Sequence, residues 1–304
     1  MTGEPGRAVR IADSPCPADV LAGIGDLELV ARIIVEGLVS GLHRSPFHGY
    51  SAEFSQYRHY RPGDDLKYVD WKLVARTGRL YTRQFRETTN MAAAIVIDTS
   101  ASMAFPAGAA LTKFRYAVMI AAALAHVIAT QGDAVGLYAA AEPGPIFLQA
   151  RSGRAHLRRV LAALTALAAK GSWRPDEAVR RVAERLGRRG LLIVVSDLYD
   201  DEERTFAELR KAARMGHEVI VVQPMSREEI EFPYRRDLEF VDLETGQTIP
   251  LNAGFARSEY RIGVAVFLER CRTRAASEGF QYSLVVTDTP PARALRGILL
   301  ARPA

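Results

Sequence analysis

The feature that most constrains the fold is an alternation, from residue 91 onward, of short apolar runs with longer amphipathic segments. The short runs are apolar at consecutive positions, which is typical of strands buried on both faces. They comprise residues 91–97, 135–139, 191–196, 217–223 and 282–287, with a short partner strand at 146–149. The longer segments have helical spacing and comprise residues 113–129, 156–169, 175–187, 202–214 and 255–277. Strands separated by helices predict a doubly wound, mostly parallel α/β sheet that is covered on both sides.

Two parts of the chain stand outside this alternation. Residues 238–251 consist of two strand-like runs around the turn sequence at 244–247, which predicts an inserted β-hairpin. Residues 1–90 are irregular except for a stretch from Leu27 to Leu38, where apolar residues recur at helical spacing and predict one helix. We therefore divide the chain into an irregular N-terminal region, 1–90, and an α/β domain, 91–304.

Composition and charge give no indication of a nucleic-acid or membrane partner, a disulfide framework, a zinc site or an export signal. The 304 residues carry 40 Lys and Arg against 35 Asp and Glu, an excess too small to assign a nucleic acid or a membrane as partner. Cys16 and Cys271 lie far apart, so neither a disulfide framework nor a zinc site is indicated. The charges and prolines of residues 1–20 argue against an export signal, and the most apolar stretch, 117–129, is shorter than a membrane span. We expect a cytoplasmic protein with no membrane segment of its own.

Oxygen-bearing side chains follow two of the predicted strands. Asp98, Ser100 and Ser102 come directly after the strand 91–97, and Asp197 follows the strand 191–196. Ligands of open α/β sheets bind outside the carboxyl ends of the strands, where these side chains meet. Carboxylate and hydroxyl oxygens are ligands that Mg²⁺ accepts. Asp-x-Ser-x-Ser alone is also typical of a helix N-cap, but the second acid at a later strand end favours a magnesium site.

This pattern resembles the metal-ion-dependent adhesion site of von Willebrand factor A domains, whose first loop is Asp-x-Ser-x-Ser and whose fourth strand ends in Asp. The resemblance implies that Asp98, Ser100, Ser102 and Asp197 hold Mg²⁺. It also implies a threonine ligand before the third main helix, where this chain has Lys-Gly-Ser-Trp-Arg-Pro at 170–175. Ser172 supplies that hydroxyl if the register shifts by one. With Trp173 at that position, the site has one ligand fewer and a bulky ring beside it.

Motifs upstream of the first strand extend the resemblance. They are Gly-Leu-His-Arg-Ser at 41–45, Gly-Tyr-Ser-Ala-Glu-Phe at 49–54, Tyr-Arg-Pro-Gly-Asp-Asp at 60–65, Asp-Trp-Lys at 70–72 and Gln-Phe-Arg-Glu at 84–87. Together with the Asp98 loop, they resemble the Domain of Unknown Function 58 family, densely over 40–200 and in outline elsewhere. The members of this family are von Willebrand factor A-like bacterial proteins commonly encoded beside MoxR-type AAA+ ATPases. The resemblance implies an adaptor that works with such an ATPase or its client in chaperone-like maturation or assembly.

The stretch 62–76 also permits an interpretation from its residues alone. Pro62 and Gly63 predict a turn, after which Leu66, Val69 and Leu73 fall on one buried face of a short helix. The charged residues of this stretch are either a helix cap and surface ion pairs or a charged docking surface.

Three hypotheses about function follow. The first is a non-enzymatic interaction protein, in which Mg²⁺ at the Asp98 loop accepts a carboxylate from a protein partner and ATP is hydrolysed by that partner. The alternative is a Mg²⁺-dependent hydrolase that uses a metal-bound water at the same site, although no general base lies near the loop in the sequence. The third is a nucleic-acid binder, which the lack of aromatic residues among the Arg-rich segments disfavours. The chain has no phosphate-binding glycine loop, so nucleotide binding by this chain is not indicated. No small-molecule substrate is expected for an interaction protein of this kind.

Overall fold

A computed structural model describes residues 16–39, 53–60, 69, 71–86, 91–141, 144–187, 189–243 and 246–301. The chain forms two compact units. One comprises residues 1–46 and 92–304 and is called the α/β unit, and the other comprises residues 47–91 and is called the hairpin unit. The sequence places a domain boundary after residue 90, and the second segment of the α/β unit begins at residue 92. Residues 1–46 belong to the same unit as the sheet.

The α/β unit is built on a six-stranded sheet with the order β10-β7-β6-β3-β4-β5. Its strands are β3 (Ala92–Ile97), β4 (Ala134–Ala139), β5 (Ile146–Arg151), β6 (Leu191–Val195), β7 (Glu218–Met225) and β10 (Gln281–Val286). All neighbouring strands are parallel except β4 and β5. This sheet confirms the doubly wound, mostly parallel α/β fold. Because the chain leaves β3 toward β4 on one side and continues from β6 toward β7 on the other, the strand order reverses between β3 and β6.

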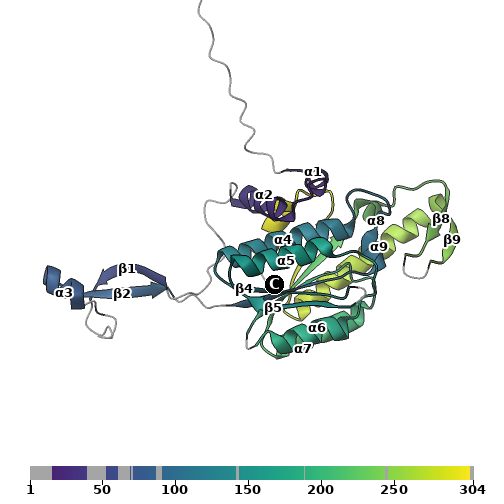
Figure 1. Ribbon diagram of the computed structural model, residues 1–304. Helices are drawn as coiled ribbons and strands as arrows, with labels where there is room; N and C mark the ends of the chain where they lie inside the picture. Colours follow the sequence, from purple (N-terminus) through teal and green to yellow (C-terminus); the bar gives the residue numbers. More distant parts are fainter. Residues whose placement is uncertain are drawn as a thin grey trace, which may run out of the picture. The chain divides into compact units, whose positions relative to one another are not determined.

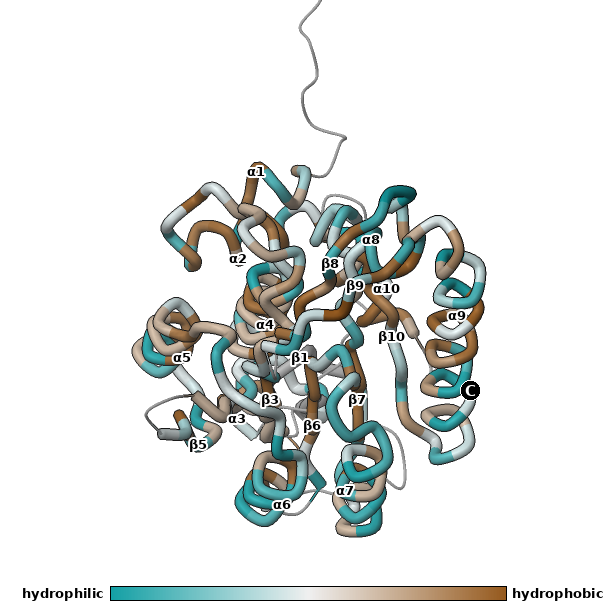
Figure 2. Tube along the Cα trace, turned by 90° about the vertical axis from the view of Figure 1, so that its right-hand side faces the viewer, coloured by the Kyte–Doolittle hydropathy of each residue, from teal (hydrophilic) through white to brown (hydrophobic). Residues whose placement is uncertain are grey.

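Helices cover both faces of this sheet (Figure 1). One side carries α4 (Lys113–Thr130) and α5 (Arg154–Ala166), and the other carries α6 (Pro175–Arg185) and α7 (Glu202–Arg214). Figure 2 shows the hydrophobic strands β6 and β7 between α4 and the pair α6 and α7. The long helix α9 (Ala253–Ser277) contributes Cys271 and Ala275 to the core on the α7 side.

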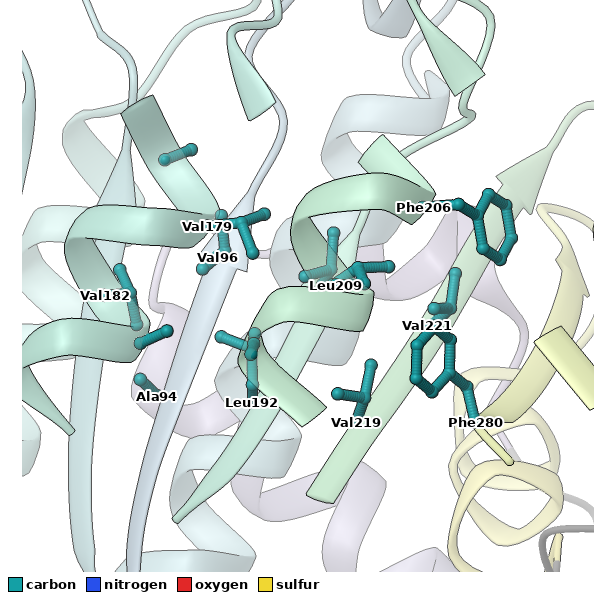
Figure 3. Close-up of a cluster of buried hydrophobic side chains, with 14 of the residues drawn as sticks. Ala94, Val96, Val179, Val182, Leu192, Phe206, Leu209, Val219, Val221 and Phe280 are labelled. Carbon is teal, nitrogen blue, oxygen red and sulfur yellow. The ribbon is translucent and has the colours of Figure 1, made fainter. Parts of the chain in front are cut away.

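Alternate strand residues point to opposite faces, which divides the core into two layers. In the layer beneath α6 and α7, Val96 and Leu192 lie with Val179 of α6 and with Phe206 and Leu209 of α7 (Figure 3). The intervening strand residues are also buried, among them Ile95, Ile97, Ile193 and Val195. This burial on both faces explains why the strands are apolar at consecutive positions.

The predicted N-terminal helix is α2 (Leu27–Val39), which is preceded by α1 (Ala18–Ala22) and packs on α4 and on α10 (Pro291–Leu300). Arg115 of α4 donates from Nη2 to the carbonyl oxygen of Ile24 at 2.8 Å, which fastens the segment between α1 and α2. Within the described residues, α4 is the one helix long and apolar enough to cross a membrane, and 72% of it is buried in the protein. It is longer than the apolar stretch 117–129, and this burial is typical of a core helix.

The hairpin unit differs from the sequence-based interpretation. β1 (Glu53–His59) and β2 (Tyr81–Arg86) pair antiparallel, and α3 (Trp71–Thr77) lies between them in sequence. The expected helical face of Leu66, Val69 and Leu73 is wrong, because Val69 forms a β-bridge with Thr82 and the helix begins only at Trp71. Leu66, Asp70 and residues 40–52 and 61–68 lie outside the described residues.

The inserted hairpin of the α/β unit is confirmed. It consists of β8 (Asp237–Val241) and β9 (Thr248–Asn252), which pair antiparallel. Residues 244 and 245 of its expected turn lie outside the described residues. The short helix α8 (Arg227–Glu231), which the sequence did not predict, joins β7 to this hairpin.

Candidate functional site

The carboxyl ends of β3 and β6 lie side by side, where the strand order reverses. Ile97 is in register with Val195, and the backbone N–H of Asp98 donates to the carbonyl oxygen of Val195 at 2.9 Å. The residues that follow each strand therefore meet at one edge of the sheet. Asp98 and Asp197 are 1% and 0% exposed, so both carboxylates are buried.

Asp98 is held through both of its carboxylate oxygens. Ser196 donates from Oγ to Asp98 Oδ2 at 2.5 Å, and the backbone N–H of Ser100 donates to Oδ1 at 2.8 Å. Burial and the charge of Asp197 raise the pKa of Asp98 to about 7, and the hydrogen bonds from Ser196 and Ser100 only partly offset this. An ionised Asp98 therefore lies in a buried environment next to another negative charge, that of Asp197.

Hydroxyls connect the two carboxylates. Ser100 Oγ lies 3.0 Å from Ser102 Oγ, and Ser102 Oγ donates to Asp197 Oδ2, also at 3.0 Å. The four residues Asp98, Ser100, Ser102 and Asp197, which were predicted from the sequence as one site, thus form one hydrogen-bonded group. Ser100 is fully buried, whereas Ser102 is partly exposed and lies nearer to solvent.

A buried ammonium group joins this site, and the sequence did not predict it. Lys113, the first residue of α4, is 0% exposed and donates from Nζ to Asp197 Oδ2 at 2.6 Å and to Glu229 Oε1 at 2.7 Å. Its Nζ also lies 4.8 Å from the centre of the Tyr199 ring. Lys113 begins a long apolar helix, where a lysine ordinarily extends into solvent, so no local signal distinguishes it.

Backbone geometry fixes the Asp197 loop. The backbone N–H of Leu198 donates to Ser196 Oγ at 3.0 Å, and that of Tyr199 donates to Asp197 Oδ1 at 3.2 Å. Leu198 adopts a left-handed φ of 62°, which turns the chain sharply after the acid. Gln223 of β7 donates from Nε2 to the carbonyl oxygen of Asp197 at 2.7 Å. These contacts orient the carboxylate toward Ser102 and Lys113.

Gly171 contacts the Asp98 loop through backbone hydrogen bonds. Its N–H donates to the carbonyl oxygen of Thr99 at 2.8 Å, and its own carbonyl oxygen accepts from the N–H of Ala101 at 3.1 Å. A Cβ at this position would lie 2.9 Å from the carbonyl oxygen of Ala140. Glycine therefore permits the segment 170–172 to run against the loop.

Ser172, the fifth predicted residue, does not join the group. It directly follows Gly171, but its side chain is exposed and lines a separate cavity of about 250 Å³ together with Tyr138 and Glu177. Trp173 is 5% exposed and donates from Nε1 to Thr205 Oγ1 at 2.8 Å, so its ring belongs to the core beneath α6 and α7.

The donors present suit a hard divalent cation. Mg²⁺ holds octahedral ligands at about 2.1 Å, which places neighbouring ligand atoms about 3.0 Å apart, and Ser100 Oγ and Ser102 Oγ have this spacing. Lys113 pairs with Asp197 and Glu229, and Asp98 is buried beside Asp197, so these four described side chains carry a net charge of −2 when all are ionised. A divalent cation would balance that charge. The part of the chain described by the structure contains no metal-holding cluster of three or more His, Cys, Asp or Glu residues, so hydroxyls are essential to this donor set.

The protein is therefore an α/β protein whose open, mostly parallel sheet carries an Asp-x-Ser-x-Ser loop and a second aspartate where the strand order reverses. The chain belongs to the family described as "Protein of unknown function DUF58", whose model matches residues 56–267, more than half of the chain. This match confirms the family resemblance that the sequence motifs indicated.

Similar proteins are found both among sequences and among solved structures. The uncharacterized protein Rv1480 of Mycobacterium tuberculosis is 30% identical over 230 residues, which cover 74% of this chain and 71% of that protein. The uncharacterized protein Mb1516 of Mycobacterium bovis has the same identity and coverage. The crystal structure of the conserved hypothetical protein BatB from Bacteroides thetaiotaomicron is 18% identical with a TM-score of 0.46, covering 69% of this chain and 97% of that one. A von Willebrand factor type A structure from Catenulispora acidiphila is 16% identical with a TM-score of 0.44, covering 71% of this chain and 43% of that one.

Proposed function

We propose that this protein is a non-enzymatic adaptor that binds a carboxylate of a protein partner through Mg²⁺ held at the Asp98 loop. The observation that carries the proposal is the hydrogen-bonded group of Asp98, Ser100, Ser102 and Asp197, which brings two hydroxyls and two buried carboxylates together at one edge of the sheet. A bound Mg²⁺ supplies an open coordination position that accepts an acidic side chain.

Some residues of this site would hold Mg²⁺, and others orient the carboxylates that do so. Ser100 and Ser102 present their hydroxyls toward each other, and Asp98 and Asp197 provide the negative charge behind them. Ser196 fixes Asp98 through Oδ2, and Tyr199 fixes Asp197 through Oδ1. Because these contacts fix the orientation of both carboxylates, little side-chain entropy remains to be lost when a cation binds.

Ser172 is the weakest member of the proposed ligand set. Its side chain is exposed and lies outside the hydrogen-bonded group, although its backbone runs beside the Asp98 loop. Ser172→Ala should therefore reduce Mg²⁺ affinity less than Ser100→Ala does.

The partner that we propose is a MoxR-type AAA+ ATPase or its protein client, and the compartment is the cytoplasm. Membership of the DUF58 family supports this partner, because such proteins are commonly encoded beside these ATPases. In this arrangement the partner hydrolyses ATP and this chain supplies the contact, with no nucleic acid or small-molecule substrate.

A Mg²⁺-dependent hydrolase at the same site is the second candidate. One observation favours it: a pKa of about 7 suits Asp98 to act as a general base near neutral pH. Against it, Asp98 is buried and both of its carboxylate oxygens already accept hydrogen bonds. We therefore rank the adaptor first.

The test is capture of a purified MoxR-type AAA+ ATPase from the same organism, with Mg²⁺ or with EDTA. Capture by the wild-type protein should require Mg²⁺ and should be lost in Asp98→Ala. The control variant is Ser277→Ala, at the exposed end of α9, which should capture the ATPase as the wild type does. Capture that persists in EDTA and in Asp98→Ala would contradict the coordination mechanism. Hydrolysis of a phosphate ester or peptide that Asp98→Ala abolishes would favour the hydrolase.

A further inference from the structure

The ammonium group of Lys113 contacts the same carboxylate oxygen of Asp197 as the hydroxyl of Ser102. Lys113 Nζ and Ser102 Oγ both donate to the same atom, Asp197 Oδ2, at 2.6 and 3.0 Å. The other carboxylate oxygen, Oδ1, accepts the backbone N–H of Tyr199. A divalent cation that shares Oδ2 with Ser102 therefore meets a positive charge that is already in place.

We propose that Lys113 is a built-in cation that competes with Mg²⁺ for Asp197 and so sets the divalent-cation affinity of this site. The proposal rests on the proposed function, in which the Asp98 loop holds Mg²⁺. Lys113 acts as a positioning residue: it holds Asp197 in the absence of metal and lowers the attraction of the site for a second cation.

Burial gives this competition its strength. Lys113, Asp197 and Glu229 are all buried, so their charges interact through protein rather than through water. Replacing Lys113 by a neutral residue changes the net charge of the buried group, including Asp98, from −2 to −3. Neutralising Glu229 changes it from −2 to −1. The two replacements therefore move cation affinity in opposite directions, although both remove the ion pair between Lys113 and Glu229.

Glu229 can be neutralised without disturbing its own support. Its Oε2 accepts from the backbone N–H of Ser226 at 2.9 Å, and its own N–H donates to Ser226 Oγ at 3.1 Å, a capping box that begins α8. An amide oxygen in Glu229→Gln retains the acceptor for Ser226. The amide NH2 group then replaces Oε1 beside Lys113 Nζ, so the variant removes the charge and the acceptor of the Lys113 contact while it keeps the cap of α8.

The experiment titrates Mg²⁺ by calorimetry into the full-length wild type, Lys113→Met, Lys113→Arg and Glu229→Gln. Lys113→Met should bind Mg²⁺ on the order of tenfold or more tighter than the wild type, because a buried positive charge has been removed. Glu229→Gln should bind it several-fold more weakly, and Lys113→Arg, which keeps the charge, should remain close to the wild type. In EDTA, Lys113→Met should unfold at a lower temperature than the wild type, and Mg²⁺ should raise its melting temperature more than that of the wild type.

A purely structural ion pair gives a different result. Lys113→Met and Glu229→Gln would then weaken Mg²⁺ binding alike, or leave it unchanged, and either outcome overturns the proposal. Should Lys113→Met fail to fold, unchanged or tighter binding by Glu229→Gln overturns it as well, as does a lack of binding in every variant. Binding by Lys113→Met but not by the wild type supports the inference and contradicts Mg²⁺-dependent partner capture. Equal binding by both, with capture intact in the wild type, contradicts the inference alone.

Discussion

At the scale of single residues, Asp98 is the group whose charge state matters most. Its carboxylate is buried beside that of Asp197, and Lys113 compensates Asp197 and Glu229 rather than Asp98. Ionisation of Asp98 is consequently opposed in the cation-free protein. The pH dependence of stability reports this opposition directly.

The free energy of unfolding in EDTA should fall as pH rises from about 4 to about 7. The pKa of Asp98 is 3.8 when exposed and about 7 in the folded protein, so the folded state holds a proton that the unfolded state releases. The stabilisation is complete below the lower pKa and is lost as pH passes the upper one. Urea denaturation at a series of pH values measures it, and Asp98→Asn should lack this part of the slope. An equal slope in both proteins would contradict the assignment to Asp98.

Ser196→Ala should destabilise the protein by about 1–3 kcal/mol at neutral pH. The hydroxyl donates to Asp98 Oδ2 and accepts from Leu198 N–H, and its removal leaves both buried groups without that contact. Urea denaturation measures the loss against Ser277→Ala, whose exposed hydroxyl should contribute within about 0.5 kcal/mol. Equal stability of the two variants would show that Ser196 does not hold the carboxylate.

The residues predicted from sequence are those that adjoin strand ends. Asp98, Ser100, Ser102 and Asp197 follow apolar runs directly, so their positions could be inferred from the pattern and from the geometry of parallel sheets. Lys113 and Glu229 reach the site from α4 and α8. Their participation depends on tertiary packing, and neither spacing nor composition indicates it.

At the scale of elements, the site depends on how closely the segment 170–172 runs along the Asp98 loop. This approach places Gly171 against Thr99 and Ala140. The strands that frame the site were predictable because they are buried on both faces. β1 and β2 were not, because their sequences are mostly polar with scattered aromatic residues and lack a continuous apolar run.

Gly171→Ala should destabilise the α/β unit by about 1–3 kcal/mol and weaken Mg²⁺ binding, because its Cβ would lie 2.9 Å from a backbone oxygen that cannot move aside easily. Gly144→Ala is the matched control, since a Cβ there meets nothing within 4 Å. Thermal unfolding and calorimetric Mg²⁺ titration of both variants measure the effects. Identical behaviour of the two glycine variants would contradict the proposed support of the loop.

At the scale of the whole molecule, the core beneath α6 and α7 holds the sheet edge in place. Phe206 is 0% exposed and stacks on Phe280, with ring centres 6.4 Å apart. Phe206→Ala should cost about 3–5 kcal/mol of the free energy of unfolding. Chemical denaturation measures this loss, and a cost below about 1 kcal/mol would show that this layer does not carry the stability assigned to it.

We propose that the carboxyl edge of β3 and β6 holds one divalent cation. The most direct measurement is electron paramagnetic resonance of Mn²⁺ titrated into the wild type and into Asp98→Asn. We expect one bound Mn²⁺ per wild-type chain, displaced by excess Mg²⁺, and markedly weaker binding by Asp98→Asn. Free Mn²⁺ throughout the wild-type titration, or equal binding by the two proteins, would contradict it.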